Sequence, residues 1–220
     1  MPTEIAPTGR FFHIGCPKTG TTTVQQVWRD DPRIELNKFS RTFNTDLWYR
    51  IPHHPDEGGG SSPGRIVVQS DENIVSGLPP FSGFFTSIRR IRKVHPDAHV
   101  YLTIREQRSF LVSGYRHQVI HTAHAWPDLA SFLDSERGRG YVAMAEYGSI
   151  VEELVHTFGS DRVHVLPMEL LRADFDAYFA RLYAPMGLKP PTDLRPFAAN
   201  RGPDDTYVRL KAALNRALPH

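Results

Sequence analysis

Short apolar runs alternate with amphipathic stretches along this chain. Runs rich in Val, Ile, Tyr and Phe predict β-strands at 11–14, 65–69, 99–104 and 162–166. Apolar residues at helical spacing predict helices at 22–29, 84–94, 109–121, 143–158, 175–186 and 205–218. Strands that alternate with helices form a parallel sheet covered on both faces, so we predict a three-layer α/β fold.

The chain is predicted to form one domain. Its 220 residues are enough to bury a substantial hydrophobic core, and we expect the folded domain to span about 11–215. Its 40% hydrophobic and 23% charged residues are ordinary for a globular protein. The segment 52–64 is rich in Gly, Ser and Pro and cannot bury apolar surface. We predict a mobile loop there, near the mouth of the site.

The glycine-rich loop at residues 15–22 is the main candidate for binding chemistry. It follows the first apolar run and opens a predicted helix, an arrangement that directs backbone N–H groups and the positive helix end at an anion. A nucleotide-hydrolysing P-loop has Lys directly after its second glycine, whereas this chain has Thr21 there and Lys18 inside the loop. The alternative is a plain turn with a solvated lysine.

A second candidate follows the third predicted strand. Arg105 comes just after the strand, Ser113 lies eight residues later in the next helix, and Tyr115 follows. The planar guanidinium of Arg matches phosphate oxygens bidentately. Taken alone, Arg105 is better explained by a surface ion pair with Glu106 or as a charge at the end of a helix.

These two motifs, in this order, resemble the sulfotransferases that use 3′-phosphoadenosine 5′-phosphosulfate (PAPS). The resemblance spans about residues 11–215, departs from the common pattern at Gln107, where proline is frequent, and implies a P-loop-like fold. It implies that Lys18 stabilises the leaving group and that residues Thr19, Gly20, Thr21 and Thr22 hold the 5′-phosphosulfate. By the same resemblance, 3′-phosphate ligands are Arg105, Ser113 and, in a late loop, Arg201 and Gly202.

A sulfonate acceptor must lose a proton, and a carboxylate within hydrogen-bond reach can take it. Glu72 follows the second predicted strand and matches the position where sulfotransferases carry a glutamate base. Asp71 is the other candidate for the base. In the alternative without a catalytic role, Asp71 and Asn73 cap the following turn and Glu72 is solvated. His13 lies within the first strand, where we expect a core histidine.

The acceptor side is less determined. His117 and Gln118 lie on a helix face that we expect to border the acceptor pocket, with a solvated polar face as the alternative. The histidines His53, His54, His121 and His124 lack acidic or cysteine partners at ligand spacing, so we predict no metal site. We expect the basic run 89–93 to form a solvent-exposed helix face, or to attract an anionic nucleotide electrostatically.

Charge and composition limit the other partners. A net charge of +2 gives no argument for nucleic acid, and no apolar run reaches the length of a membrane span. The single cysteine, Cys16, excludes an internal disulfide, and no signal peptide is visible, which favours a cytoplasmic enzyme. We therefore expect a sulfotransferase acting on a small-molecule or carbohydrate acceptor. The alternatives are an ATP-dependent P-loop kinase and a non-catalytic module that binds an adenine nucleotide.

Overall fold

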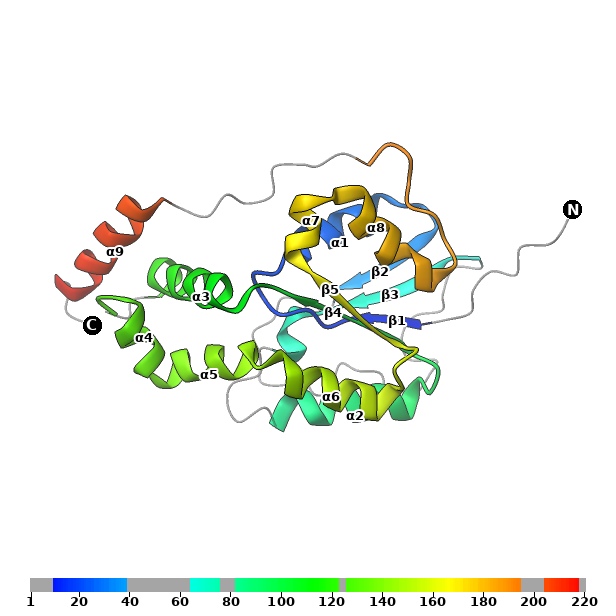
Figure 1. Ribbon diagram of the computed structural model, residues 1–220, viewed down its shortest axis with the longest axis horizontal. Helices are drawn as coiled ribbons and strands as arrows, with labels where there is room; N and C mark the ends of the chain where they lie inside the picture. Colours follow the sequence, from blue (N-terminus) through cyan, green and yellow to red (C-terminus); the bar gives the residue numbers. More distant parts are fainter. Residues whose placement is uncertain (1–9, 39–63, 76–81, 123–125, 195–203, 218–220) are drawn as a thin grey trace, which may run out of the picture.

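The computed structural model describes residues 10–38, 64–75, 82–122, 126–194 and 204–217. At its centre is a parallel sheet of five strands in the order β2-β3-β1-β4-β5 (Figure 1). The strands are β1 Arg10–His13, β2 Ile34–Lys38, β3 Ile66–Ser70, β4 His99–Ile104 and β5 Val163–Pro167. The predicted parallel α/β sheet is confirmed.

Helices cover both faces of this sheet, with α1, α7 and α8 on one side and α2 and α6 on the other (Figure 1). Their bounds are α1 Thr21–Asp30, α2 Ser82–Val94, α3 Gln107–His121, α4 Leu129–Asp134, α5 Glu136–Ala145, α6 Tyr147–Phe158, α7 Met168–Ala173, α8 Phe175–Tyr183 and α9 Asp205–Ala217. Short 3₁₀ turns are η2 Glu72–Ile74 and η3 Ala184–Met186. None of the helices in these described ranges is long and apolar enough to cross a membrane.

The two layers of core explain why the strands read as continuous apolar runs. Phe11 packs with Trp28 of α1 and Phe179 of α8, while the next residue, Phe12, packs on the opposite face in the cluster that contains Ile88 of α2. Side chains alternate along a strand, so a strand covered on both faces must be apolar at successive positions.

The structure adds elements that the sequence pattern did not predict. The edge strand β2, with its Ile-Glu-Leu-Asn-Lys sequence, pairs only with β3, and the short helices α4 and α7 also went unpredicted. The predicted helix 143–158 was wrong as one element, because the chain leaves helical geometry at Glu146 (ψ 60°), where α5 ends and α6 begins. Most of the predicted loop 52–64 lies outside the described residues.

Helices α3, α4, α5 and α9 lie beyond the carboxyl ends of the strands (Figure 1). Helix α9 packs on α3 through Val119, Val208 and Ala212, and the Asn215 amide donates to the Val119 carbonyl. On another side of α3, a Cβ added at Gly114 would lie 2.4 Å from the Tyr141 ring of α5. The absence of a side chain at Gly114 therefore lets α5 approach α3.

We expect Gly114→Ala to lower the free energy of unfolding by about 1–3 kcal/mol, because the added methyl group overpacks the α3–α5 contact. Gly148→Ala, in helix α6, is the matched control, because a Cβ added there would have no neighbouring atom within 4 Å. The control should gain up to about 1 kcal/mol from the lower chain entropy of alanine. Urea unfolding measures both, and equal stability of the two variants would contradict the close contact.

Candidate active site

Three neighbouring strands, β3, β1 and β4, end at the same edge of the sheet, and each is followed by a predicted site residue. The loop that contains Lys18 follows β1, Glu72 begins η2 after β3, and Arg105 follows β4. Strands β2 and β3 lie on one side of β1 in the sheet, and β4 and β5 lie on the other. The strand order therefore reverses at β1, and α/β proteins bind ligands at such a switch point.

The loop after β1 is shaped as an anion cradle. Lys18 and Gly20 have left-handed backbone conformations (φ 66° and 86°), and alternation of such residues turns successive N–H groups to one side. In the described part of the chain, the N–H groups of residues 18–22 donate to no protein acceptor. This leaves a row of free donors at the N-terminus of α1, available to a ligand.

A series of buried side-chain hydrogen bonds holds this loop from beneath. The Thr19 hydroxyl donates to the Cys16 carbonyl at 2.5 Å, and its oxygen lies 2.7 Å from the Thr103 hydroxyl, which must then be the donor. Thr103 has thereby used its only proton. It accepts from Nε2 of His13, at 3.4 Å.

The same reasoning fixes the far end of the series. Burial lowers the pKa of His13 to about 3, so the ring is neutral, and with Nε2 protonated its Nδ1 must accept from the Ser70 hydroxyl at 2.8 Å. The Ser70 oxygen accepts from the Gln25 amide at 2.9 Å. His13 is thus the core histidine that the sequence predicted, and it also supports the loop.

Close approach of the backbone is a second constraint on the loop. A Cβ at Gly15 would lie 1.9 Å from Oγ1 of Thr103 and 3.0 Å from Nε2 of His13. Only glycine leaves room for this hydrogen bond beneath the loop. Cys16, next in sequence, is fully buried, and burial raises the pKa of its thiol to about 12, so the floor of the loop carries no charge at neutral pH.

Arg105 lies against the cradle. Its Nη1 donates to the Lys18 carbonyl at 3.3 Å, and its buried Nε has no hydrogen-bond partner among the described residues. Burial and the neighbouring Arg172 lower the pKa of the guanidinium. The Glu106 carboxylate instead caps α3, accepting from the N–H groups of Arg108 and Ser109, so the predicted alternative of an Arg105–Glu106 ion pair is not formed.

Glu72 reaches the loop from the other side. Its Oε2 accepts from the Thr21 hydroxyl at 2.7 Å, which places a carboxylate at the first residue of α1. The hydroxyls of Thr19 and Thr21 therefore have protein partners in this structure, and these residues offer the cradle their backbone N–H groups. Thr22, the next residue, is exposed.

The α3 residues named from the sequence divide into two kinds. Ser113 and His117 are half-buried one turn apart; burial lowers the pKa of His117 to about 4, and the charge of Lys18 contributes. Gln118 is engaged on both sides of its amide, donating to the Tyr141 hydroxyl at 3.1 Å and accepting from Arg137 at 2.7 Å. Neither Tyr141 nor Arg137 was predicted as a site residue.

Other sequence candidates lie elsewhere. Arg201 and Gly202 fall outside the described residues, as do His53, His54 and His124. Within the described ranges no group of three or more His, Cys, Asp and Glu side chains is placed to hold a metal ion.

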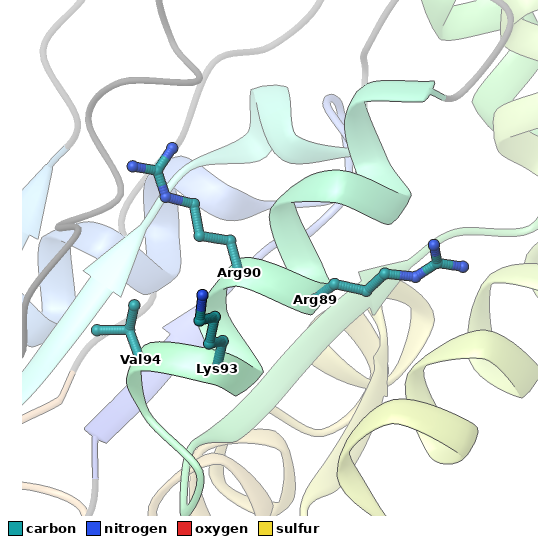
Figure 2. Close-up of a pocket in the computed structure, with 4 residues that line it drawn as sticks. All are labelled: Arg89, Arg90, Lys93 and Val94. Atoms are coloured by element: carbon teal, nitrogen blue, oxygen red, sulfur yellow. The ribbon is translucent and has the colours of Figure 1, made fainter.

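The basic run on α2 lies away from the cradle. Its hollow is lined by Arg89, Arg90, Lys93 and Val94, and Figure 2 shows the two arginine side chains pointing in different directions. Arg89 lies 3.8 Å from a carboxylate oxygen of Glu153. This half of α2 leads into β4, at the amino edge of the sheet, opposite the edge that carries the loop.

Comparison with known structures identifies the architecture. A crystal structure of a sulfotransferase from Alicyclobacillus acidocaldarius is similar over 95% of this chain and 94% of its own, with a TM-score of 0.67 and 18% identity. The chain has the sulfotransferase fold. The sulfotransferase domain from the Synechococcus PCC 7002 olefin synthase is similar over 100% of this chain and 91% of its own, with a TM-score of 0.57 and 13% identity.

Sequence comparison adds nothing to this fold assignment, since no protein-family model and no curated protein matches the chain. A mouse sulfotransferase, SULT7A1, solved in complex with PAP, aligns with a TM-score of only 0.43 at 13% identity, over 94% of this chain and 64% of its own. That likeness is too slight to bear on this site.

We expect Thr103→Val to lower the free energy of unfolding by about 1–3 kcal/mol, because the buried N–H of His13 then loses its acceptor. Thr103→Ser keeps the hydroxyl and should retain most of the stability. ¹⁵N NMR of the His13 ring should show the Nε2–H tautomer in the unmodified protein and in Thr103→Ser. An Nδ1–H tautomer in the unmodified protein would contradict the hydrogen-bond directions given above.

Proposed function

We propose that this protein transfers a sulfonate group from PAPS to a hydroxyl or amine of a small-molecule or carbohydrate acceptor. The sulfotransferase fold supports the reaction class, and the two candidate phosphate sites support the donor. Residues 18–22 bind the 5′-phosphosulfate, and Arg105 and Ser113 bind the 3′-phosphate.

The contact between Arg105 and the loop carries this proposal. It brings a guanidinium with an unpaired, buried Nε directly beside a row of free backbone N–H groups. Each of these is a strong phosphate-binding feature, and a doubly phosphorylated nucleotide needs two such sites at once.

In the proposed reaction Glu72 is the base. One carboxylate oxygen is held by Thr21, and the other has no partner among the described residues. In the proposed reaction this carboxylate takes the proton of the acceptor hydroxyl as the acceptor oxygen bonds to sulfur and the bond from sulfur to the phosphate oxygen breaks. Lys18, exposed at the tip of the loop, stabilises the negative charge that grows on the departing phosphate oxygen.

The kinase alternative has less support. A nucleotide-hydrolysing P-loop carries lysine directly after its second glycine, but this chain has Thr21 after Gly20. The Thr21 hydroxyl donates a hydrogen bond to Glu72. The binding-module alternative differs from the proposal only in turnover, so a test of catalysis separates the two.

We expect the product nucleotide 3′-phosphoadenosine 5′-phosphate (PAP) to raise the melting temperature and ATP with Mg²⁺ to leave it unchanged. Arg105→Ala should weaken PAP binding by about 10- to 100-fold, because a charge-assisted hydrogen bond to the 3′-phosphate is lost. Arg108→Ala, at an exposed position in the first turn of α3, is the control and should bind PAP normally. Unchanged PAP affinity in Arg105→Ala would contradict the assigned role.

We expect Glu72→Gln to reduce transfer of labelled sulfonate from PAPS by about 10²- to 10⁴-fold while PAP affinity stays the same, since the amide still accepts from Thr21 but takes no proton. Transfer is measured against a panel of hydroxyl acceptors. Asp71→Asn tests the rival carboxylate in the same assay. Full transfer by Glu72→Gln would remove Glu72 from the mechanism.

A further inference from the structure

Gln118 holds two donors of a neighbouring helix in fixed positions. Its Oε1 accepts from Nη1 of Arg137 and its Nε2 donates to the hydroxyl of Tyr141, so both sides of the amide are occupied by α5. Two of the four hydrogen-bonding positions of the amide are thus used within the protein. Its role is to orient Arg137 and Tyr141.

The Tyr141 hydroxyl keeps its proton for another partner. Its oxygen accepts from Gln118, and no acceptor for its O–H is found among the described residues. The ring is buried against Gly114, which fixes its direction. Burial is the main cause of the raised pKa of this hydroxyl; the Gln118 hydrogen bond and the charge of Arg137 oppose the rise, and the charge of Glu72 adds to it.

Arg137 is a half-buried cation without a carboxylate partner. Its hydrogen bond to the neutral Gln118 amide uses one of five N–H donors, and no ion pair to it is found in the described part of the chain. A guanidinium left in this state is a receptor for an oxyanion, because its planar donors match two oxygens at once.

We propose that Arg137 and Tyr141 form a subsite for an oxyanion group of the acceptor, a carboxylate or phosphate carried in addition to the hydroxyl that receives the sulfonate. The subsite offers donors and a positive charge, which suits an anionic group. The subsite lies on α5, which packs against α3 beyond the carboxyl ends of the strands, the edge at which Glu72 follows β3. This inference rests on the proposed function, since Glu72 defines where the hydroxyl reacts.

The test compares acceptors that share a carbon skeleton and differ in whether they carry an anionic group. Glucuronate and glucose 6-phosphate are set against glucose, and 4-hydroxyphenylacetate against its methyl ester, with labelled PAPS as donor. We expect the anionic member to have a kcat/KM about tenfold or more above the neutral one, since a hydrogen bond to a charged group is involved. Saturation-transfer NMR on PAP-loaded protein gives binding of the same compounds independently of turnover.

The variants isolate the cation. Arg137→Gln should lower the preference for anionic acceptors to about one, with the same melting-temperature shift by PAP. Arg139→Gln is the matched control, because this exposed arginine two residues along α5 donates to the Asp134 carbonyl instead. It should keep the preference of the unmodified protein.

Three outcomes would overturn the subsite. The first is an equal kcat/KM for neutral and anionic acceptors in the unmodified protein, and the second is a preference for anionic acceptors that survives in Arg137→Gln. The third is PAP-loaded protein that neither binds nor sulfonates any of the anionic compounds. Failure of PAP to stabilise the protein would instead refute the proposed function itself, so the two failures are distinguishable.

Discussion

The close approach of the β1 and β4 ends, with Gly15 against Thr103, is the contact on which the candidate site depends. It allows a series of hydrogen bonds to reach from Gln25 of α1 through β3, β1 and β4 to the Cys16 carbonyl. The series ends on that carbonyl, which accepts from the Thr19 hydroxyl. The free N–H groups of the loop are the counterpart on the outer side.

The parallel sheet converts this local arrangement into a site. Since all five strands run the same way, whatever follows β3, β1 and β4 is brought to one edge. Glu72 and Arg105 are far apart in sequence, yet both contact the loop, one through Thr21 and the other through the Lys18 carbonyl. Helices α3 and α5 lie beyond this edge and pack against each other there.

Much of this arrangement could be predicted from the sequence. Apolar runs located four of the five strands, and because residues after parallel strands meet at one edge, the loop, Glu72 and Arg105 could be grouped before any coordinates. The edge strand β2 was missed because its mixed sequence lacks a continuous apolar run, which only strands covered on both faces require. The break at Glu146 was missed because helical periodicity continues across it.

The acceptor side shows what sequence patterns leave out. Gln118 was noticed through its place on a helix face, but its partners Arg137 and Tyr141 belong to α5, a helix whose placement against α3 follows from tertiary packing. Local spacing carries no signal for such a contact. Thr103 was hidden for the same reason, since within an apolar strand its hydroxyl has no pattern that marks it as functional.

The uniform direction of the bonds beneath the loop has an electrical consequence. From Gln25 to Thr19 each donor hydrogen is oriented toward the next group nearer the loop, and every member of the series is uncharged at neutral pH. Aligned dipoles of this kind present a partial positive potential at one end without a buried ion and its desolvation cost. The loop can thus have a positive potential on its outer side while the groups directly beneath it stay neutral, so no ion has to be buried under the loop.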